Sequence, residues 1–291
     1  MSKLAVSIFR PAGAAKGAVE IIHGMSEHRK RYDDFAKFLC ENGYAVYTFD
    51  LPGHGENEGL RGWFGEKDGW DYVLYSAAEV MKTAKSENPG IPFILFGHSM
   101  GTIVARCLLQ EYDSELNGLV LTGAPNYQPA VKAGIALGKI LKMTKGARGH
   151  SAVMDQAVTG NFNKAVKDPK TPYDWISYNT ENIQKYVDDP QCGFPFTIQG
   201  YIDELTGLER LHDSSKYRCT KKDLPILFAA GKDDPCIGGE AGFADSIATL
   251  TKAGYTDIDS KLYDGMRHEI LNEIDHTRVY EDILNWIRQK V

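Results

Sequence analysis

The stretch IPFILFGHSMGTIVARCLL, residues 91–109, decides the fold of this chain. Residues 91–96 form a short apolar run that is typical of a buried strand, and residues 102–109 are typical of the start of a helix. Between them lies Gly97-His98-Ser99-Met100-Gly101, a G-x-S-x-G pattern. This order predicts a nucleophile elbow, in which a sharp turn holds the serine above the sheet edge, beside a helix N-terminus. Only glycine fits where neighbouring chain comes this close. The alternative interpretation is a glycine-flanked turn with an idle serine.

Six further strands are predicted on either side of this turn, and they alternate with helices. The strands cover residues 4–9, 17–23, 44–49, 116–122, 224–230 and 258–263. The helices, besides the one after the turn, cover residues 31–42, 68–86, 240–253 and 275–289. This alternation predicts an α/β fold with a mostly parallel central sheet that helices cover on both faces. Functional residues are then expected in loops at the carboxyl ends of the strands.

The chain changes character between residues 126 and 222, which contain no convincing buried strand. This segment holds helical patches and nine notable aromatic residues: Tyr127, Phe162, Tyr173, Trp175, Tyr178, Tyr186, Phe194, Phe196 and Tyr201. It predicts a helical lid inserted between two parts of the core, residues 1–125 and 223–291. We expect most of these aromatic side chains to pack the lid onto the core and a minority to line an apolar groove.

Length and composition exclude several classes of protein. The 291 residues suit one large domain or a domain with an insertion. The formal charge of −6 argues against a nucleic-acid binder, and no apolar run approaches the ~20 residues of a membrane span. The N-terminus alternates like a strand and has no signal-peptide core. The five cysteines show no zinc spacing and are interpreted as reduced thiols, so a cytoplasmic protein without a metal is predicted.

The early strand ends at His23-Gly24-Met25, a turn that suggests a second part of a catalytic site. The backbone N–H groups of Met25 and Met100 are the predicted donors of an oxyanion hole. Asp50 and His54 lie in the next glycine-rich loop, and we interpret them as residues that brace the loop rather than as catalytic partners.

A serine hydroxyl becomes a good nucleophile only when a base accepts its proton, and the usual base is histidine. The histidines after Ser99 are His150, His212, His268 and His276. The first two fall in the predicted lid, and the fourth falls at the start of the last helix. His268 lies in the loop after the last strand, where a catalytic histidine is expected, and it is therefore the predicted base.

The carboxylate that orients the histidine is expected after the preceding strand. Asp233 and Asp234 both fall there, and we prefer Asp234 as the last residue of a G-x-x-D pattern. Asp264 is nearer to the histidine in sequence, but it lies after the last strand and therefore on the wrong loop for this carboxylate. The resulting order of Ser99, Asp234 and His268 is the order of the triad in α/β-hydrolases.

Four stretches, residues 23–32, 50–55, 97–101 and 263–273, resemble the monoacylglycerol lipase and lysophospholipase branch of the α/β-hydrolases. This branch is also grouped with the serine aminopeptidase-like hydrolases. The stretches span nearly the whole chain, and the lid is the least matched part. The chain departs from the family pattern at Asn57, where a serine is usual, and at Cys236, where an aliphatic residue is usual.

The resemblance implies an α/β-hydrolase that cleaves carboxylic esters, most simply a monoacylglycerol to a fatty acid and glycerol, through an acyl-enzyme on Ser99. It implies no cofactor and no metal, and a small lipid or ester as the substrate. A lysophospholipase and a short-chain carboxylesterase are alternatives. An aminopeptidase-like hydrolase would need lid carboxylates for the substrate amine, for which Asp188-Asp189 and Asp203-Glu204 are candidates. A non-catalytic ligand receptor with a hydrolase fold is a further alternative.

Residues 130–143 of the predicted lid could form an interfacial helix, with Lys132, Lys139 and Lys142 at its polar edge. Such a helix would give the protein transient contact with a membrane surface. The alternative is a helix that packs only on its own core.

Overall fold

A seven-stranded sheet forms the centre of the computed structural model, which describes residues 4–291. The strands are β1 (Val6–Phe9), β2 (Gly17–Ile22), β3 (Tyr44–Phe49), β4 (Phe93–His98), β5 (Gly118–Thr122), β6 (Ile226–Gly231) and β7 (Ile258–Tyr263). Their order in the sheet is β1-β3-β2-β4-β5-β6-β7, and β1 alone is antiparallel to its neighbour. The predicted α/β fold with a mostly parallel sheet is confirmed. Residues 1–3, the start of the predicted core segment, lie outside the described residues.

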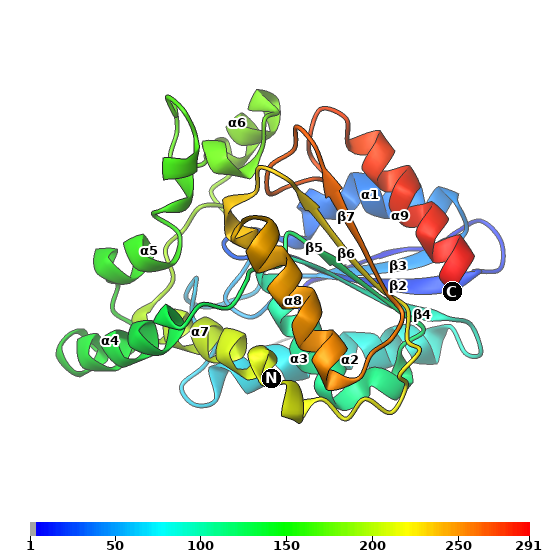
Figure 1. Cartoon of the computed structure of the whole chain (residues 1–291), viewed down its shortest axis with the longest axis horizontal. Coiled ribbons are helices and arrows are strands. Elements are labelled where there is room, and N and C mark those ends of the chain that lie inside the picture. Colours follow the sequence, from blue (N-terminus) through cyan, green and yellow to red (C-terminus); the bar gives the residue numbers. More distant parts are fainter. Residues whose placement is uncertain (1–3) are drawn as a thin grey trace.

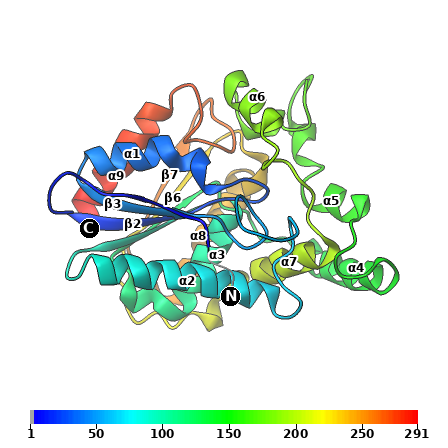
Figure 2. The same cartoon turned by 180° about the vertical axis from the view of Figure 1, so that it is seen from behind.

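Helices cover both faces of the sheet (Figures 1 and 2). One face carries α1 (Asp33–Glu41) and α9 (His276–Lys290), and the other carries α2 (Gly69–Glu87), α3 (Met100–Tyr112) and α8 (Gly239–Ala253). Successive residues of β2 point to opposite faces, so Val19 and Ile21 join the first apolar layer while Ala18 and Ile22 join the second. The strands therefore read as continuous apolar runs because both of their faces are buried.

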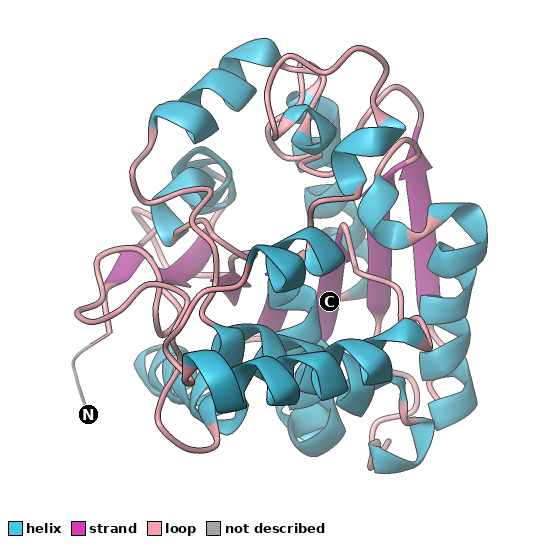
Figure 3. Ribbon diagram, turned by 90° about the vertical axis from the view of Figure 1, so that its left-hand side faces the viewer, coloured by secondary structure: helices cyan, strands magenta, loops and turns pink. Residues whose placement is uncertain are grey.

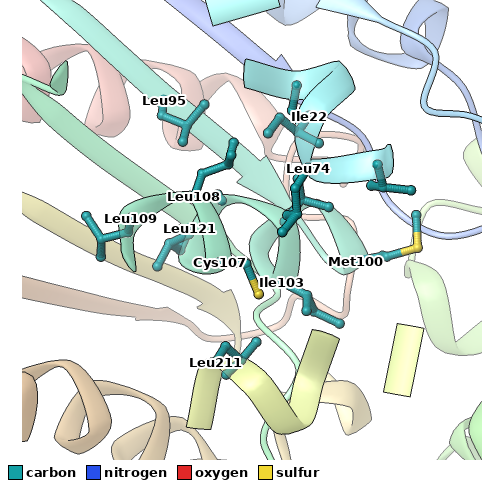
Figure 4. Close-up of a cluster of buried hydrophobic side chains, with 14 of the residues drawn as sticks. Ile22, Leu74, Leu95, Met100, Ile103, Cys107, Leu108, Leu109, Leu121 and Leu211 are labelled. Atoms are coloured by element: carbon teal, nitrogen blue, oxygen red, sulfur yellow. The ribbon is translucent and has the colours of Figure 1, made fainter. Parts of the chain in front are cut away.

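The helix after the serine, α3, is buried on nearly all sides because it has neighbours on nearly all sides. It packs on the sheet, on α2 and on α7 (Ile198–His212). Figure 4 shows Leu108 and Leu109 of this helix beside Leu121 of β5, with Leu211 of α7 in the same cluster. The polar residues among the buried side chains of α3 are paired: Arg106 donates to the Pro125 carbonyl oxygen at 3.0 Å, and Gln110 Nε2 donates to the Arg210 carbonyl oxygen at 3.0 Å. The packing holds α3, and with it the residue at its N-terminus, in a fixed place.

The segment predicted as a lid contains helices and no strand. Its main helices are α4 (Ala130–Lys145), α5 (Ala152–Val158), α6 (Thr180–Asp188) and α7. They gather at one end of the sheet, beyond the carboxyl ends of the parallel strands (Figures 1 and 3). Helix α7 packs against α4 on one side and against α3 of the core on the other, so the lid is anchored to the core along this helix. Within residues 4–291, no helix combines the length and the apolar character that a bilayer crossing requires.

The strand before the serine begins and ends two residues later than predicted: it covers Phe93–His98 rather than 91–96. It begins late because Pro92 has no N–H and contributes only its carbonyl oxygen, which accepts a hydrogen bond from the Ala18 N–H at 2.8 Å. It ends late because Gly97 still pairs with Ile22 of β2. The sharp turn is therefore confined to Ser99.

The side chain of Glu20 on β2 is buried in this core without a partner. Its exposed fraction is 0%, and neither carboxylate oxygen has a hydrogen-bond partner among the described residues. Burial raises its pKa well above the usual value, because a charged carboxylate is poorly solvated in an apolar interior. The folded protein therefore keeps Glu20 protonated at pH values at which the unfolded chain ionises it.

We predict that Glu20→Gln changes the pH dependence of stability. Above the unfolded-state pKa of about 4.3, folding of the wild type requires proton uptake by Glu20, so the free energy of unfolding falls as the pH rises toward the folded-state pKa. Glutamine does not ionise, so in the variant this position does not lower the free energy of unfolding as the pH rises. Urea unfolding at pH 5 and pH 8 should show a gain of stability for the variant that is larger at pH 8. Equal pH dependence of the two proteins would contradict the prediction.

Candidate active site

The turn at Ser99 has the strained backbone of a nucleophile elbow. Its φ is +51° and its ψ is −121°, a conformation that costs free energy for a residue other than glycine. A Cβ atom on Gly101 would lie 2.1 Å from the Ile22 carbonyl oxygen, and one on Gly97 would lie 2.5 Å from the Gly101 carbonyl oxygen. The Ser99 N–H donates to the Thr122 carbonyl oxygen at 2.9 Å. Both glycines are thus required by the close approach of β2, β4 and α3.

The loops after β6 and β7 bring Asp234 and His268 together. The Nδ1–H of His268 donates to Asp234 Oδ2 at 2.8 Å, and both side chains are buried. Asp234 Oδ1 also accepts the Cys236 N–H at 2.8 Å, which fixes the carboxylate. With Nδ1 occupied by this bond, Nε2 is the nitrogen available to accept a proton. The ring of Trp175 lies 4.9 Å from the His268 ring, between centroids, and limits its movement.

The other candidates for base and acid lie elsewhere. Asp233 accepts a hydrogen bond from the Tyr178 hydroxyl at 3.0 Å, and Asp264 pairs with Lys232 on the surface at 3.2 Å. Among the histidines, His150 contacts the Phe196 carbonyl oxygen, His212 stacks on Tyr127, and His276 contacts the Glu273 carbonyl oxygen. None of these residues lines the cavity described next.

Ser99 and His268 both line a cavity of about 840 Å³ between the core and the lid. Its walls are contributed by α4, α5 and α7, by the loops between them and by the loop that holds Asp234. Five of the nine lid aromatics singled out in the sequence lie on its wall: Phe162, Tyr173, Trp175, Tyr186 and Phe194. This is more than the minority that was predicted, because the lid arches over the cavity and turns much of its inner face toward it. The size and apolar walls suit a small molecule with a substantial hydrocarbon part.

The turn that carries Met25 is fixed by two buried side chains. The Leu51 N–H donates to His23 Nε2 at 2.9 Å, so His23 Nδ1 carries the proton and donates to the Gly24 carbonyl oxygen at 2.7 Å. The Gly24 N–H donates to Glu27 Oε1 at 2.5 Å. Met25 lines the cavity beside Ser99. Met100 is the first residue of α3, where backbone N–H groups have no partner within the helix.

Asp50 and His54 bond to the surrounding loops and not to each other. Asp50 forms an ion pair with Arg29 and accepts the Glu56 N–H at 2.8 Å. His54 Nε2 accepts the Ser26 N–H at 3.3 Å. The interpretation of both residues as braces agrees with these contacts.

Asn57 stands where the family usually has serine, and it fastens the same loop. Its side chain accepts the Ala5 N–H at 2.9 Å and donates to the Asp50 carbonyl oxygen at 2.7 Å. These bonds join the loop after β3 to the chain just before β1.

A buried ion network, which the sequence analysis did not anticipate, joins three segments around the site. Arg31 donates to Glu27 Oε2 at 2.7 Å, to both oxygens of Glu269 at 2.5 and 2.7 Å, and to Asn182 Oδ1 at 3.0 Å. These partners come from the turn after β2, from the residue after His268, and from α6 of the lid. Burial raises the pKa of Glu27, but Arg31 and nearby histidines lower it more, to about 2, so this carboxylate is charged. Both Arg31 and Glu269 fall within the stretches singled out in the sequence, but nothing there showed that they pair.

The pKa values of two neighbouring histidines of the site, His98 and His268, are shifted in opposite directions. Burial lowers the pKa of His268, but the Asp234 carboxylate more than offsets this effect and leaves the pKa raised above its usual value. The neighbouring His98 has no such partner, and burial together with His268 lowers its pKa to about 4. His98 is therefore neutral near pH 7, whereas His268 is the basic one of the pair.

Two groups of side chains have the composition of a metal site: Asp234, Cys236 and His268, and a second group of His28, Asp189 and Cys192. In each group the possible ligand atoms lie within 4.8 Å of one another. Burial raises the pKa of both thiols and favours the neutral form, which is a weak metal ligand. In both groups the histidine already bonds the aspartate. The prediction that no metal is bound stays a prediction.

The elbow, the sheet order and the inserted lid define an α/β-hydrolase. The family described as serine aminopeptidase, S33, matches residues 13–275, and the chain belongs to that family. The predicted resemblance to the monoacylglycerol lipase branch is confirmed by the relatives described next.

A monoacylglycerol lipase of Mycolicibacterium smegmatis is 26% identical over 98% of this chain and 92% of its own length. The phospholipase YtpA of Bacillus subtilis is 30% identical over 90% of this chain and 92% of its own length. A thermostable carboxyl esterase from Bacillus coagulans, solved in complex with glycerol, superimposes with a TM-score of 0.91 at 27% identity and covers 99% of this chain and 94% of its own. The prediction of a carboxylic ester hydrolase is confirmed by this agreement.

We predict that Asp234→Asn lowers the pKa of His268. Without the carboxylate, burial remains as the main influence, and burial disfavours the charged imidazolium. An NMR titration of the His268 ring should give a pKa above 6.5 in the wild type and a lower value in the variant, so the neutral ring predominates at a lower pH in the variant. Asp264→Asn removes a surface carboxylate from the loop that holds His268 and serves as the control. An unchanged pKa in Asp234→Asn would contradict the assignment.

Proposed function

We propose that the chain hydrolyses the carboxylic ester of a monoacylglycerol and releases a fatty acid and glycerol. One observation carries this proposal: a serine in a strained elbow and a histidine bonded to a carboxylate share one largely apolar cavity. This juxtaposition suits an uncharged ester with a long hydrocarbon part.

In the proposed mechanism, Ser99 Oγ attacks the ester carbonyl carbon while His268 Nε2 accepts the serine proton. Asp234 holds the imidazole in the required tautomer and stabilises the imidazolium that forms. The N–H groups of Met25 and Met100 donate to the oxyanion of the tetrahedral intermediate. His268 then gives its proton to the departing glycerol oxygen. In the second half, His268 activates a water molecule that attacks the acyl-enzyme and releases the fatty acid.

The charges of the cavity favour a neutral substrate over a phospholipid. Four carboxyl-bearing residues line it, namely Glu27, Asp155, Glu204 and Glu269, and none of the described lining residues is a lysine or arginine. A substrate phosphate would find no cationic partner there, and burying an unpaired charge is costly. The likeness to a phospholipase nevertheless makes lysophospholipid hydrolysis the second candidate function.

An aminopeptidase activity has less support. Neither Asp188 nor Asp189 lines the cavity, and Asp203 does not line it either. Glu204 is the one member of the two candidate lid pairs that does. A lone carboxyl that burial keeps protonated is a poor ligand for a substrate ammonium group.

We predict that Ser99→Ala lowers the rate of monoacylglycerol hydrolysis on the order of 10⁴-fold or more, because the nucleophile is removed. Fatty-acid release from a long-chain monoacylglycerol, a lysophosphatidylcholine and a short-chain ester should be compared for the wild type and the variant. Circular dichroism and thermal unfolding provide the control for the fold. Fast Ser99-dependent release from the monoacylglycerol supports the proposal, and cleavage of the short ester alone would remove the lipid substrate. Near-normal rates in the variant would exclude the mechanism.

Contact with a membrane surface is part of the same proposal, because monoacylglycerols partition into lipid. The outer side of α4 exposes Ile140 (62%) and Met143 (86%). Of the lysines predicted at its polar edge, Lys132 pairs with Glu209 and Lys142 bonds Gln199, both on α7. The inner residues Val131 and Ile135 of α4 are buried, so the helix has apolar side chains on opposite sides. This supports insertion of its outer side into the headgroup region.

We predict that Ile140→Asp and Met143→Asp each weaken binding to phospholipid vesicles about tenfold, because each removes an apolar side chain that would leave water on binding. Co-sedimentation with vesicles that contain anionic lipid measures the effect. Val6→Asp alters an exposed apolar residue of β1, away from the lid, and should bind like the wild type. Wild-type binding by both α4 variants would show that this helix does not touch the membrane.

A further inference from the structure

The lid contributes an almost uniformly apolar wall to the cavity, which we call the α4–α7 wall. It consists of the lining residues on α4 and α7, among them Val131, Leu137, Leu205 and Leu208. Glu204 is the exception, because it is the one residue of this wall with a polar side chain. The two helices pack along each other, so their side chains form one continuous surface.

The side chain of Glu204 has no hydrogen-bond partner within residues 4–291. The residue is 7% exposed, and its Oε2 atom is buried without a hydrogen-bond partner among the described residues. A buried polar group that is left unpaired destabilises the fold, and most such groups in folded proteins are paired. The position on the cavity wall offers an explanation, because a ligand could provide the missing partner.

The neighbouring carboxyl on the same helix provides a contrast. Asp203 is buried to the same degree, but it does not line the cavity. Its Oδ1 accepts a hydrogen bond from Gln199 Nε2 at 2.8 Å. Its Oδ2 is buried without a hydrogen-bond partner among the described residues, but it lies against the start of α2, where a Cβ on Gly69 would be 2.3 Å away. Asp203 therefore has one partner on its own helix and faces the core, whereas Glu204 has no partner among the described residues and faces the cavity.

The charge state of Glu204 limits the kind of ligand group that it can bind. Burial raises its pKa to about 8, so near pH 7 the carboxyl is mostly protonated. A protonated carboxyl donates one hydrogen bond through its O–H and accepts others through its carbonyl oxygen. A neutral group that both donates and accepts, such as a hydroxyl, is therefore a better partner than an ammonium group.

We propose that Glu204 is a specificity-determining residue that hydrogen bonds to a hydroxyl group on the acyl chain of the substrate. The inference rests on the proposed function, since it requires an ester at Ser99 whose acyl chain lies along the α4–α7 wall. A plain hydrocarbon chain would cover the Glu204 carboxyl and leave it unpaired. A chain with a hydroxyl at the matching carbon would pair it, and the enzyme would prefer that chain.

The test uses 1-monoacylglycerols of stearic acid and of hydroxystearic acids that carry the hydroxyl at successive positions along the chain. The wild type should show a kcat/KM about tenfold higher than for the stearoyl ester at one position or a narrow group of positions. Glu204→Leu should lose this preference, so that its kcat/KM for each hydroxystearoyl ester is no higher than its kcat/KM for the stearoyl ester. Glu204→Gln, which keeps a donor and an acceptor, should retain part of it. Asp203→Asn is the matched control on the same helix and should keep the wild-type ratio.

The ratio of two substrates on one enzyme does not change when a variant is merely less stable, so it separates specificity from structure. Efficient hydrolysis of the stearoyl ester with no hydroxyl preference at any position overturns the inference and leaves the proposed function intact. The same preference in Glu204→Leu as in the wild type also overturns it. A larger gain from an amino group than from a hydroxyl at the same carbon overturns it and favours an amine-bearing substrate. If no ester of the series shows Ser99-dependent hydrolysis, the proposed function fails and the inference with it.

Discussion

The close approach of three backbone segments at Ser99 is the constraint on which the rest of the structure depends. The carbonyl oxygen of Ile22, the first residues of α3 and the end of β4 meet with no room for a Cβ on Gly97 or Gly101. The strain at Ser99 persists because the sheet on one side and the buried helix α3 on the other hold both ends of the turn. A buried α3 is therefore required, since its packing against the sheet, α2 and α7 keeps the serine in place.

Around this fixed point, the other groups of the site are positioned by mutual bonds between loops. Arg31 connects the turn after β2, the loop of His268 and the lid helix α6 through Glu27, Glu269 and Asn182. Loss of one partner from such a buried network typically costs about 3–5 kcal/mol, because another charge is left unpaired. The network therefore holds lid helix α6 and the loops of Glu27 and His268 in one common geometry.

The site combines charged groups that are fully paired with carboxyls that are not. Glu27 and Glu269 are held as carboxylates by Arg31, and Asp234 is held by His268 and a backbone N–H. In contrast, Glu204 lacks a partner, and burial keeps it protonated. The paired groups support a fixed site, whereas an unpaired group on the wall of a cavity is available to a ligand. The paired residues maintain the geometry of the site, whereas Glu204 is the residue that we propose binds a hydroxyl group of the substrate.

The sequence by itself determined the elbow, the alternation of strands and helices, and the order of Ser99, Asp234 and His268, because these depend on local pattern and on loops that a parallel sheet brings to one edge. The sequence predicted the ends of some strands two residues away from their observed positions, since proline and the hydrogen bonds to neighbouring strands decide where pairing starts. Only the tertiary structure decided which of two adjacent carboxyls faces the cavity. Asp203 and Glu204 differ by about 100° around α7, so the packing of that helix between α3 and α4 turns one toward α2 and the other toward the substrate space.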